Sequence, residues 1–245
     1  MHFPAERSGN DPCVLESVQP LLSELAASIH VDVVDAGHDH RVEAEGFVHR
    51  VFAQRYHADV QSFYPTLLSF RDRGHPRALV GFRDALAGRL FAEQYLEEAA
   101  QELIGERVGE AVSREALVEV GSLALENPGD ARWVIAASTC FLHVLGYRWV
   151  LFTATRTLIN SFQRLGLQPL ALVSARPLLL DDQGEQWGNY YQAGPVVCAG
   201  NIASGYQKLH RHVGHGQPML RSLLAEMEQR AGLFAYPESA VCGAE

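Results

Sequence analysis

The chain has 245 residues, 47% of them apolar and 20% charged, an ordinary composition for a globular protein with a full hydrophobic core. Its formal net charge of −9, with 20 Lys and Arg against 29 Asp and Glu, argues against a nucleic-acid partner, because phosphate binding needs a basic face. The 4 cysteines form neither a CxxC pair nor a metal-ligand spacing, and the first residues lack a secretory signal pattern. We therefore expect a reducing, cytoplasmic location.

The first third of the chain alternates between helical and β-type patterns. The predicted elements are, in order, a loose arm (1–12), an amphipathic helix (14–29), a strand (31–35), a helix (42–56) and a β-hairpin (66–72 and 77–85). Asp39 stands where a helix N-cap is expected. The hairpin is predicted because the turn-forming run Arg73-Gly74-His75-Pro76 separates two β-type runs.

The rest of the chain continues this alternation. The predicted elements are a helix (90–103), a strand (116–125), a helix (131–145), a strand (149–153), a helix ending at Gly166, a strand (170–173), a turn (181–184), a strand (195–202) and a helix (218–231). Gly121 interrupts its strand where strands often bulge or let another group approach closely. Gly146 and Arg148 divide the longest apolar stretch, residues 133–154, into a helical and a β-type part, which argues against a membrane span.

This order predicts an α/β (α+β) fold with a mixed, mostly antiparallel central sheet flanked by helices. No internal repeat, low-complexity block or long linker divides the sequence, so we predict a single globular domain. Residues 1–38 would form an N-terminal arm, helix and first strand, residues 39–205 the core, and residues 206–245 a C-terminal helix and tail.

Two motifs resemble those of acyl-transferring enzymes. Residues 155–167, TRTLINSFQRLGL, are similar to the helix N-x-x-A-x-x-L-Y-x-K-x-G-F of GCN5-related N-acyltransferases (GNAT proteins), with Thr155 at the asparagine and Phe162 at the tyrosine. Residues 119–125, EVGSLAL, resemble the strand E-x-S-R-F-x-V of acyl-homoserine lactone synthases, with Glu119 in the acidic position. The arginine of that strand is absent, which argues against a homoserine lactone product.

A wider similarity is carried by stretches that include FVHRVFAQRYHADV, EVGSLAL, WVLFTAT and WGNYYQAGPVVCAGNI, in that order. Through these stretches the chain resembles, over residues 39–205, the bacterial thermostable hemolysin (delta-VPH-like) family. The family name implies cell lysis, whereas the acyltransferase motifs imply a GNAT-like core and chemistry on an acyl thioester.

The acyltransferase resemblance implies that the loop after the central strand binds the pyrophosphate of coenzyme A or the phosphopantetheine of a carrier protein. Here that loop is ENPGDA (126–131), and its candidate donor-binding residues are Asn127 and Gly129. A proline and two carboxylates disfavour tight coenzyme A binding, so a carrier-protein donor fits better. For Asp130 we prefer a structural role as an N-cap.

Glu119 is the candidate general base, because a carboxylate in an apolar strand would be desolvated and could take a proton from an attacking amine. The alternative is a solvent-facing residue, since strand alternation places Val118 and Val120 on the other face. Since Phe162 replaces the tyrosine that often protonates the leaving thiolate in the resembling enzymes, that role would pass to another donor, such as Tyr190 or Tyr191, or to solvent.

The remaining candidates line the expected substrate path, and each has an ordinary structural alternative. Ser122 would contact the acyl carbonyl or face solvent, and Thr153 and Thr155 would bind a pantetheine arm or serve as common β-type residues. Trp187 would form a pocket wall or join the core. The candidate ligands for an acceptor carboxylate, or else solvated surface residues, are Arg50, Arg55 and Arg83.

The 11 histidines include a pair at 38 and 40 and a group at 210–215, but these lie in polar, loop-like segments without a third ligand type, so we predict no metal. The favoured function is transfer of an acyl group from a carrier-protein or acyl-CoA thioester to an amine or other small acceptor, in specialised-metabolite biosynthesis. The thioester would be a co-substrate, with no tightly bound cofactor. The alternatives are a membrane-active protein that inserts the helix at 220–234, and a non-catalytic protein that only binds an acyl ligand.

Overall fold

The computed structural model describes residues 29–180, 184–213 and 218–235, and its centre is a sheet of 7 strands in the order β1-β2-β3-β4-β5-β7-β6. The strands are β1 (Ile29–Val34), β2 (Thr66–Asp72), β3 (His75–Asp84), β4 (Leu117–Leu125), β5 (Trp149–Ala154), β6 (Leu170–Ser174) and β7 (Val196–Asn201). β4 and β5 run parallel, and all other neighbouring strands run antiparallel. The mixed, mostly antiparallel sheet is therefore confirmed, as is the hairpin of β2 and β3.

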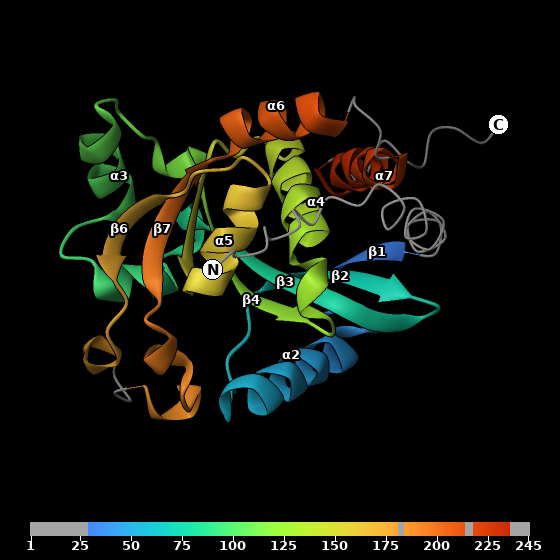
Figure 1. Cartoon of the computed structure of the whole chain (residues 1–245), viewed down its shortest axis with the longest axis horizontal. Coiled ribbons are helices and arrows are strands. Elements are labelled where there is room, and N and C mark those ends of the chain that lie inside the picture. The colour runs from blue at the N-terminus through green and yellow to red at the C-terminus, as the bar shows by residue number, and fades with distance from the viewer. Residues whose placement is uncertain (1–28, 181–183, 214–217, 236–245) are drawn as a thin grey trace, which may run out of the picture.

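Helices cover both faces of the sheet (Figure 1). They are α2 (Arg41–Tyr56), α3 (Ala100–Val108), α4 (Ala131–Val144), α5 (Arg156–Arg164), α6 (Ile202–Val213) and α7 (Pro218–Ala235). α2 buries Phe47, Val48 and Phe52 in a cluster with residues of β2, β3 and β4. α4 lies on the opposite face and is apolar nearly all round, because it contacts both the sheet and the helices α5, α6 and α7.

β4 and β5 separate halfway along their length. Their parallel pairing runs from Leu117 opposite Trp149 to Val120 opposite Phe152. Beyond these residues β4 continues alongside β3, while β5 continues alongside β7. A bulge in the β3–β4 pairing follows Gly121, and Ser122 takes a left-handed conformation with φ of 49°. The two strands therefore open a gap in the middle of the sheet.

Three predicted elements differ from the structure. The helix predicted over 90–103 is instead a short 3₁₀ turn (Phe91–Tyr95) followed by α3, because the carboxylate of Glu93 accepts the backbone N–H groups of Leu90 (2.8 Å) and Ala100 (3.0 Å) and folds the chain back. Asp39 is not the N-cap of α2; His40 holds that position without a side-chain cap bond.

The first part of the segment 210–215, predicted as loop-like, belongs to α6, which extends to Val213. The apolar contacts of α6 come from Ile202, Tyr206 and Leu209, which recur at helical spacing and pack on the cluster around α4. The predicted arm (1–12), most of the helix at 14–29, the turn at 181–183 and the tail after residue 235 lie outside the described residues.

Candidate functional site

A cavity of about 340 Å³ lies at the gap between β4 and β5 and is lined from both faces of the sheet. On the α2 face it is bordered by Glu119, Tyr64 and a group of aromatic side chains. On the α4 face its walls are mainly aliphatic. A ligand that passes through the gap would therefore meet polar and aromatic groups on one side and an apolar wall on the other.

Glu119 lies on the α2 face of β4 and is only 1% exposed. The alternative of a solvent-facing residue is wrong, because the turn at 91–95 covers this face. The backbone N–H of Phe91 donates to Glu119 Oε2 (2.8 Å) and that of Ala92 to Oε1 (2.6 Å). Burial raises the pKa of the Glu119 carboxyl, although these N–H bonds and the nearby Arg83 guanidinium oppose the rise.

A second buried carboxylate fixes the segment that holds Glu119. Glu93 accepts hydrogen bonds from both terminal nitrogens of the Arg114 guanidinium, at 2.6 and 3.1 Å. It also accepts hydrogen bonds from the backbone N–H groups of Leu90 and Ala100. Burial alone would raise the pKa of the Glu93 carboxyl, but Arg114 and those N–H donors outweigh it and hold the pKa below the ordinary value. Glu93 therefore stays ionised and keeps the N–H groups of Phe91 and Ala92 aimed at Glu119.

Tyr64, in the loop between α2 and β2, is a site residue that the sequence prediction missed. Its ring lies across Gly81 and Gly121, which face each other on β3 and β4, and a Cβ atom on either glycine would collide with it. The pKa of its phenol is raised well above the ordinary value, by burial first and then by the charge of the nearby Glu119 carboxylate. The available signal was Gly121, which marked a close approach without identifying the residue that approaches.

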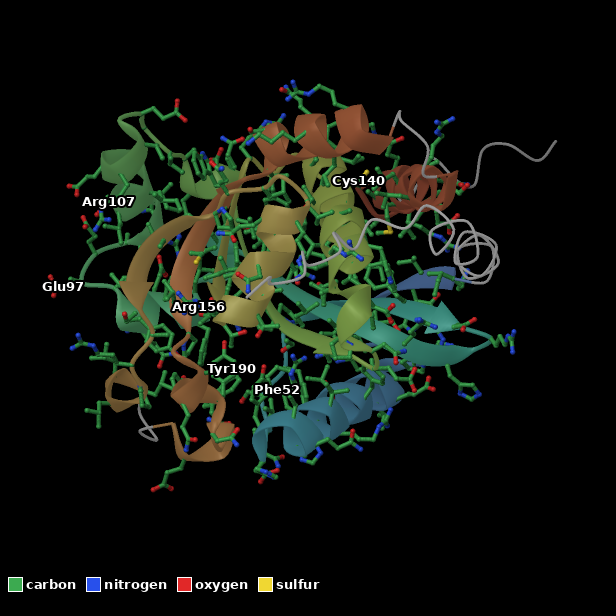
Figure 2. All side chains as sticks on the ribbon, viewed as in Figure 1. Phe52, Glu97, Arg107, Cys140, Arg156 and Tyr190 are labelled. Atoms are coloured by element: carbon green, nitrogen blue, oxygen red, sulfur yellow. The ribbon has the colours of Figure 1, made fainter. Side chains whose placement is uncertain are left out.

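Aromatic side chains form a large part of this half of the cavity. Trp187, Tyr190 and Tyr191 all line it, in a segment that docks on the end of α2 through the Asn189 N–H, which donates to the Tyr56 carbonyl (2.8 Å). The ring of Tyr190 lies 5.1 Å from that of Tyr56 and 5.7 Å from that of Trp187, which in turn lies 6.1 Å from the ring of Phe52; Figure 2 labels Tyr190 and Phe52.

Of the three candidate arginines, two line the cavity and one does not. Arg83 of β3 lies opposite Glu119 of β4 in the strand register and lines the cavity. Arg55, near the end of α2, also lines it. Arg50 is exposed, stacks over Phe47 and is not among the cavity-lining residues, so the structure does not bring it to the cavity. The reason is helical geometry: five residues along a helix turn the side chain about 140° away.

The residues predicted to contact the donor also divide into two groups. Ser122, Thr153 and Thr155 line the cavity on both sides of the gap. Asn127 and Gly129 are exposed and do not line it, so the structure does not bring them to the site. This is because the loop turns as a short 3₁₀ helix (Pro128–Asp130).

Asp130 does not act as a side-chain N-cap of α4. Its buried carboxylate accepts hydrogen bonds from Arg77 Nε (2.9 Å) and Trp133 Nε1 (2.9 Å). Asp130 therefore places a carboxylate at the start of α4, the end of a helix that binds anions in other proteins.

The α4 half of the cavity is an apolar arm. Its aliphatic residues are Val80, Leu123, Leu125, Val134, Ile135 and Leu142. Phe162 of α5, which stands at the tyrosine position of the GNAT motif, stacks on Phe152 with ring centroids 4.9 Å apart. Ser138 also lines this arm, and its buried hydroxyl has no hydrogen-bond partner among the described residues.

His210 and Cys140 do not line the cavity. His210 of α6 pairs with Glu228 (3.4 Å), and Cys140 lies beside α7 (Figure 2). Burial raises the pKa of the Cys140 thiol to about 12. Within the described parts of the chain, no group of three or more His, Cys, Asp or Glu residues is arranged to hold a metal ion, and no helix is both long and apolar enough to cross a membrane.

The fold is that of acyl-transferring enzymes. The CoA-dependent acyl-homoserine lactone synthase BjaI, solved with SAM and isopentyl-CoA, is 15% identical with a TM-score of 0.51, over 84% of this chain and 99% of BjaI. Apo TofI (17% identity, TM-score 0.50) matches over 74% of this chain and 96% of its own. FeeM, an N-acyl amino acid synthase from uncultured soil microbes (12%, TM-score 0.50), matches over 74% and 94%. The expected GNAT-like fold is confirmed.

Within this fold class, residues 34–206 match the model of the family described as thermostable hemolysin. The chain belongs to that family, as the sequence resemblance implied. No curated protein sequence matches the chain significantly.

Proposed function

We propose that the protein transfers an acyl group from a thioester to the amine of a small acceptor. The observation that carries this proposal is the buried Glu119 at the gap between β4 and β5, where the apolar arm meets the aromatic half of the cavity. A carboxylate whose pKa is raised is a stronger base than an ordinary one and is suited to take a proton from an attacking amine.

The two halves of the cavity suit the two substrates. The acyl chain would lie in the apolar arm, where burial of each CH₂ group contributes about 0.8 kcal/mol. The thioester would sit at the gap, where the diverging edges of β4 and β5 offer backbone groups to a pantetheine arm. The acceptor would enter from the aromatic side, where Arg55 and Arg83 suit a carboxylate.

Two further points refine the substrates. The ion-paired Asp130 at the start of α4 favours a carrier-protein donor, held by its phosphopantetheine arm, over coenzyme A with its pyrophosphate. The arginines on the acceptor side favour an amine that also carries a carboxylate, and FeeM of the same fold is described as an N-acyl amino acid synthase. We place this reaction in specialised-metabolite biosynthesis.

Native mass spectrometry with acyl-CoA and with acyl-loaded carrier protein tests the donor. We expect a complex or loss of the acyl mass with the carrier protein, and a weaker response with acyl-CoA. The Glu119→Gln variant should still bind the donor without discharging it; wild-type protein that binds and never discharges would support the non-catalytic, acyl-binding alternative. No response to either donor would contradict the proposal.

The membrane-active alternative depends on the helix at 220–234 having an exposed apolar face. In the structure most of that face is buried. Leu220, Leu223, Leu224 and Met227 are buried against the cluster around α4, which leaves Leu233 and Phe234 as its exposed large apolar residues. Leakage of dye from liposomes at low protein concentration would restore this alternative.

A further inference from the structure

The contact between Tyr64 and the glycine pair is closer than ordinary packing. A Cβ atom on Gly81 would lie 2.7 Å from the Cβ of Tyr64, and one on Gly121 would lie 2.6 Å from its ring carbon Cε2. Contacts under 3.0 Å essentially never occur at real Cβ atoms. Two glycines paired across β3 and β4 therefore form a flat platform on which the ring rests.

The backbone of Tyr64 is also fixed. The guanidinium of Arg41, at the start of α2, donates to the carbonyl oxygens of Tyr64 (2.8 Å) and Pro65 (3.1 Å). The hydroxyl end of the ring lies over Gly121 of β4, two residues after Glu119, whose side chain extends from the same face of the strand. Gly121 is the first residue after the last β4–β5 pair, so the phenol lies at the point where the strands part.

We propose that Tyr64 relays the proton that Glu119 takes from the amine to the departing thiolate. The inference rests on the proposed acyl transfer. The amine nitrogen attacks the thioester carbon, a C–N bond forms, and the Glu119 carboxylate takes the amine proton. The C–S bond then breaks with its electron pair on sulfur; the Tyr64 hydroxyl gives its proton to that sulfur and receives the proton held by Glu119. The products are an amide and a thiol, and both side chains return to their starting states.

The relay explains why a phenol with a strongly raised pKa suits this position. Such a phenol does not ionise alone, so it passes a proton on only when another group supplies one in the same step. Glu119 is that group, because its carboxyl is far more acidic than a thiol even with its raised pKa. Tyr191, predicted for the thiolate role, instead shares a 2.6 Å hydrogen bond with Tyr95.

Tyr64→Phe removes the hydroxyl and keeps the ring on its platform. With an alkyl thioester we expect turnover to fall about 100-fold, and with an aryl thioester, whose thiolate leaves without a proton, to fall by less than about threefold. Tyr147→Phe is the matched control, because it removes a phenol that also donates to a carboxylate (Asp84 Oδ2, 2.9 Å) but does not line the cavity. An equal loss with both thioesters, or no loss, would overturn the relay.

A second measurement separates failure of the relay from failure of the proposed function. The infrared titration of the Glu119 carboxylate, assigned by its loss in Glu119→Gln, needs no substrate. The relay requires the Tyr64 hydroxyl to donate to the ionised carboxylate, so Tyr64→Phe should raise the pKa of Glu119. An unchanged titration would show that the two groups do not communicate and would overturn the relay even in a protein without turnover. An active wild type with an unaffected Tyr64→Phe variant would overturn the relay alone.

Discussion

Glu93 and Glu119 are two buried carboxylates on either side of one short segment, and they differ in what neutralises them. Glu93 receives an arginine guanidinium and two backbone N–H groups, and its pKa is held low. Glu119 receives two backbone N–H groups and, among the described residues, no direct ion pair, and its pKa is raised. The difference shows how one fold keeps a structural carboxylate ionised and leaves its neighbour able to exchange a proton.

The comparison is tested most strongly by removing the reactive carboxylate. Glu119→Gln keeps the shape of the side chain and one acceptor for the backbone N–H groups, and we expect turnover to fall about 100- to 10 000-fold. Steady-state kinetics measure the loss. In the wild type, activity should rise with pH as Glu119 loses its proton, above the 4.5 of an ordinary glutamate. A variant with near-normal turnover would remove Glu119 from the chemistry.

Removing the structural carboxylate should act on stability first. Glu93→Ala leaves Arg114 and two buried N–H groups without their partner, so we expect a loss of about 3–5 kcal/mol in unfolding free energy, measured by urea denaturation. Glu97→Ala, on an exposed neighbour labelled in Figure 2, is the control and should change little.

The ion pair between Glu93 and Arg114 predicts that the free energy of unfolding depends on pH. Because the folded-state pKa of Glu93 is lowered, its contribution is fully present above about pH 4.5 and is lost as the pH falls through the folded-state value. The Glu93→Ala variant should lose less stability than the wild type over that acid range. Parallel curves for the two proteins would contradict the assignment.

A smaller effect is expected from the acceptor side. Arg83→Ala should raise the KM for a carboxylate-bearing amine about tenfold, the equivalent of about 1.4 kcal/mol, with a lesser change for Arg55→Ala. Removing the Arg83 charge should also raise the pKa of Glu119 and move the acid limb of the pH profile upward. Arg50→Ala is the control, since this exposed side chain does not line the cavity.

The smallest effect is expected at Ser138. Its buried hydroxyl lacks a described partner, so Ser138→Ala should stabilise the fold by about 1 kcal/mol and improve use of plain hydrocarbon chains. Ser69→Ala is matched to it, because Ser69 is also buried and unpartnered but lies outside the cavity lining. If Ser69→Ala also changed the acyl preference, the effect of Ser138→Ala would not come from a direct contact between Ser138 and the acyl chain.

Local pattern was enough to predict most of the sheet and the placement of Glu119 on β4. It failed where a tertiary contact decides the structure: Glu93 divides a helical pattern by capturing the N–H groups of Leu90 and Ala100. It also failed for Tyr64, an isolated tyrosine in a loop, whose role depends on two glycines from different strands. Gly121 indicated a close approach, but one sequence does not identify the partner.

The most direct test of acyl transfer is to measure the thiol released and the amide formed when the wild-type protein meets an acyl-carrier thioester and a panel of amino acids. The proposed function predicts equal amounts of thiol and amide, both lost in Glu119→Gln. An intact thioester, or thiol release without amide, would contradict it.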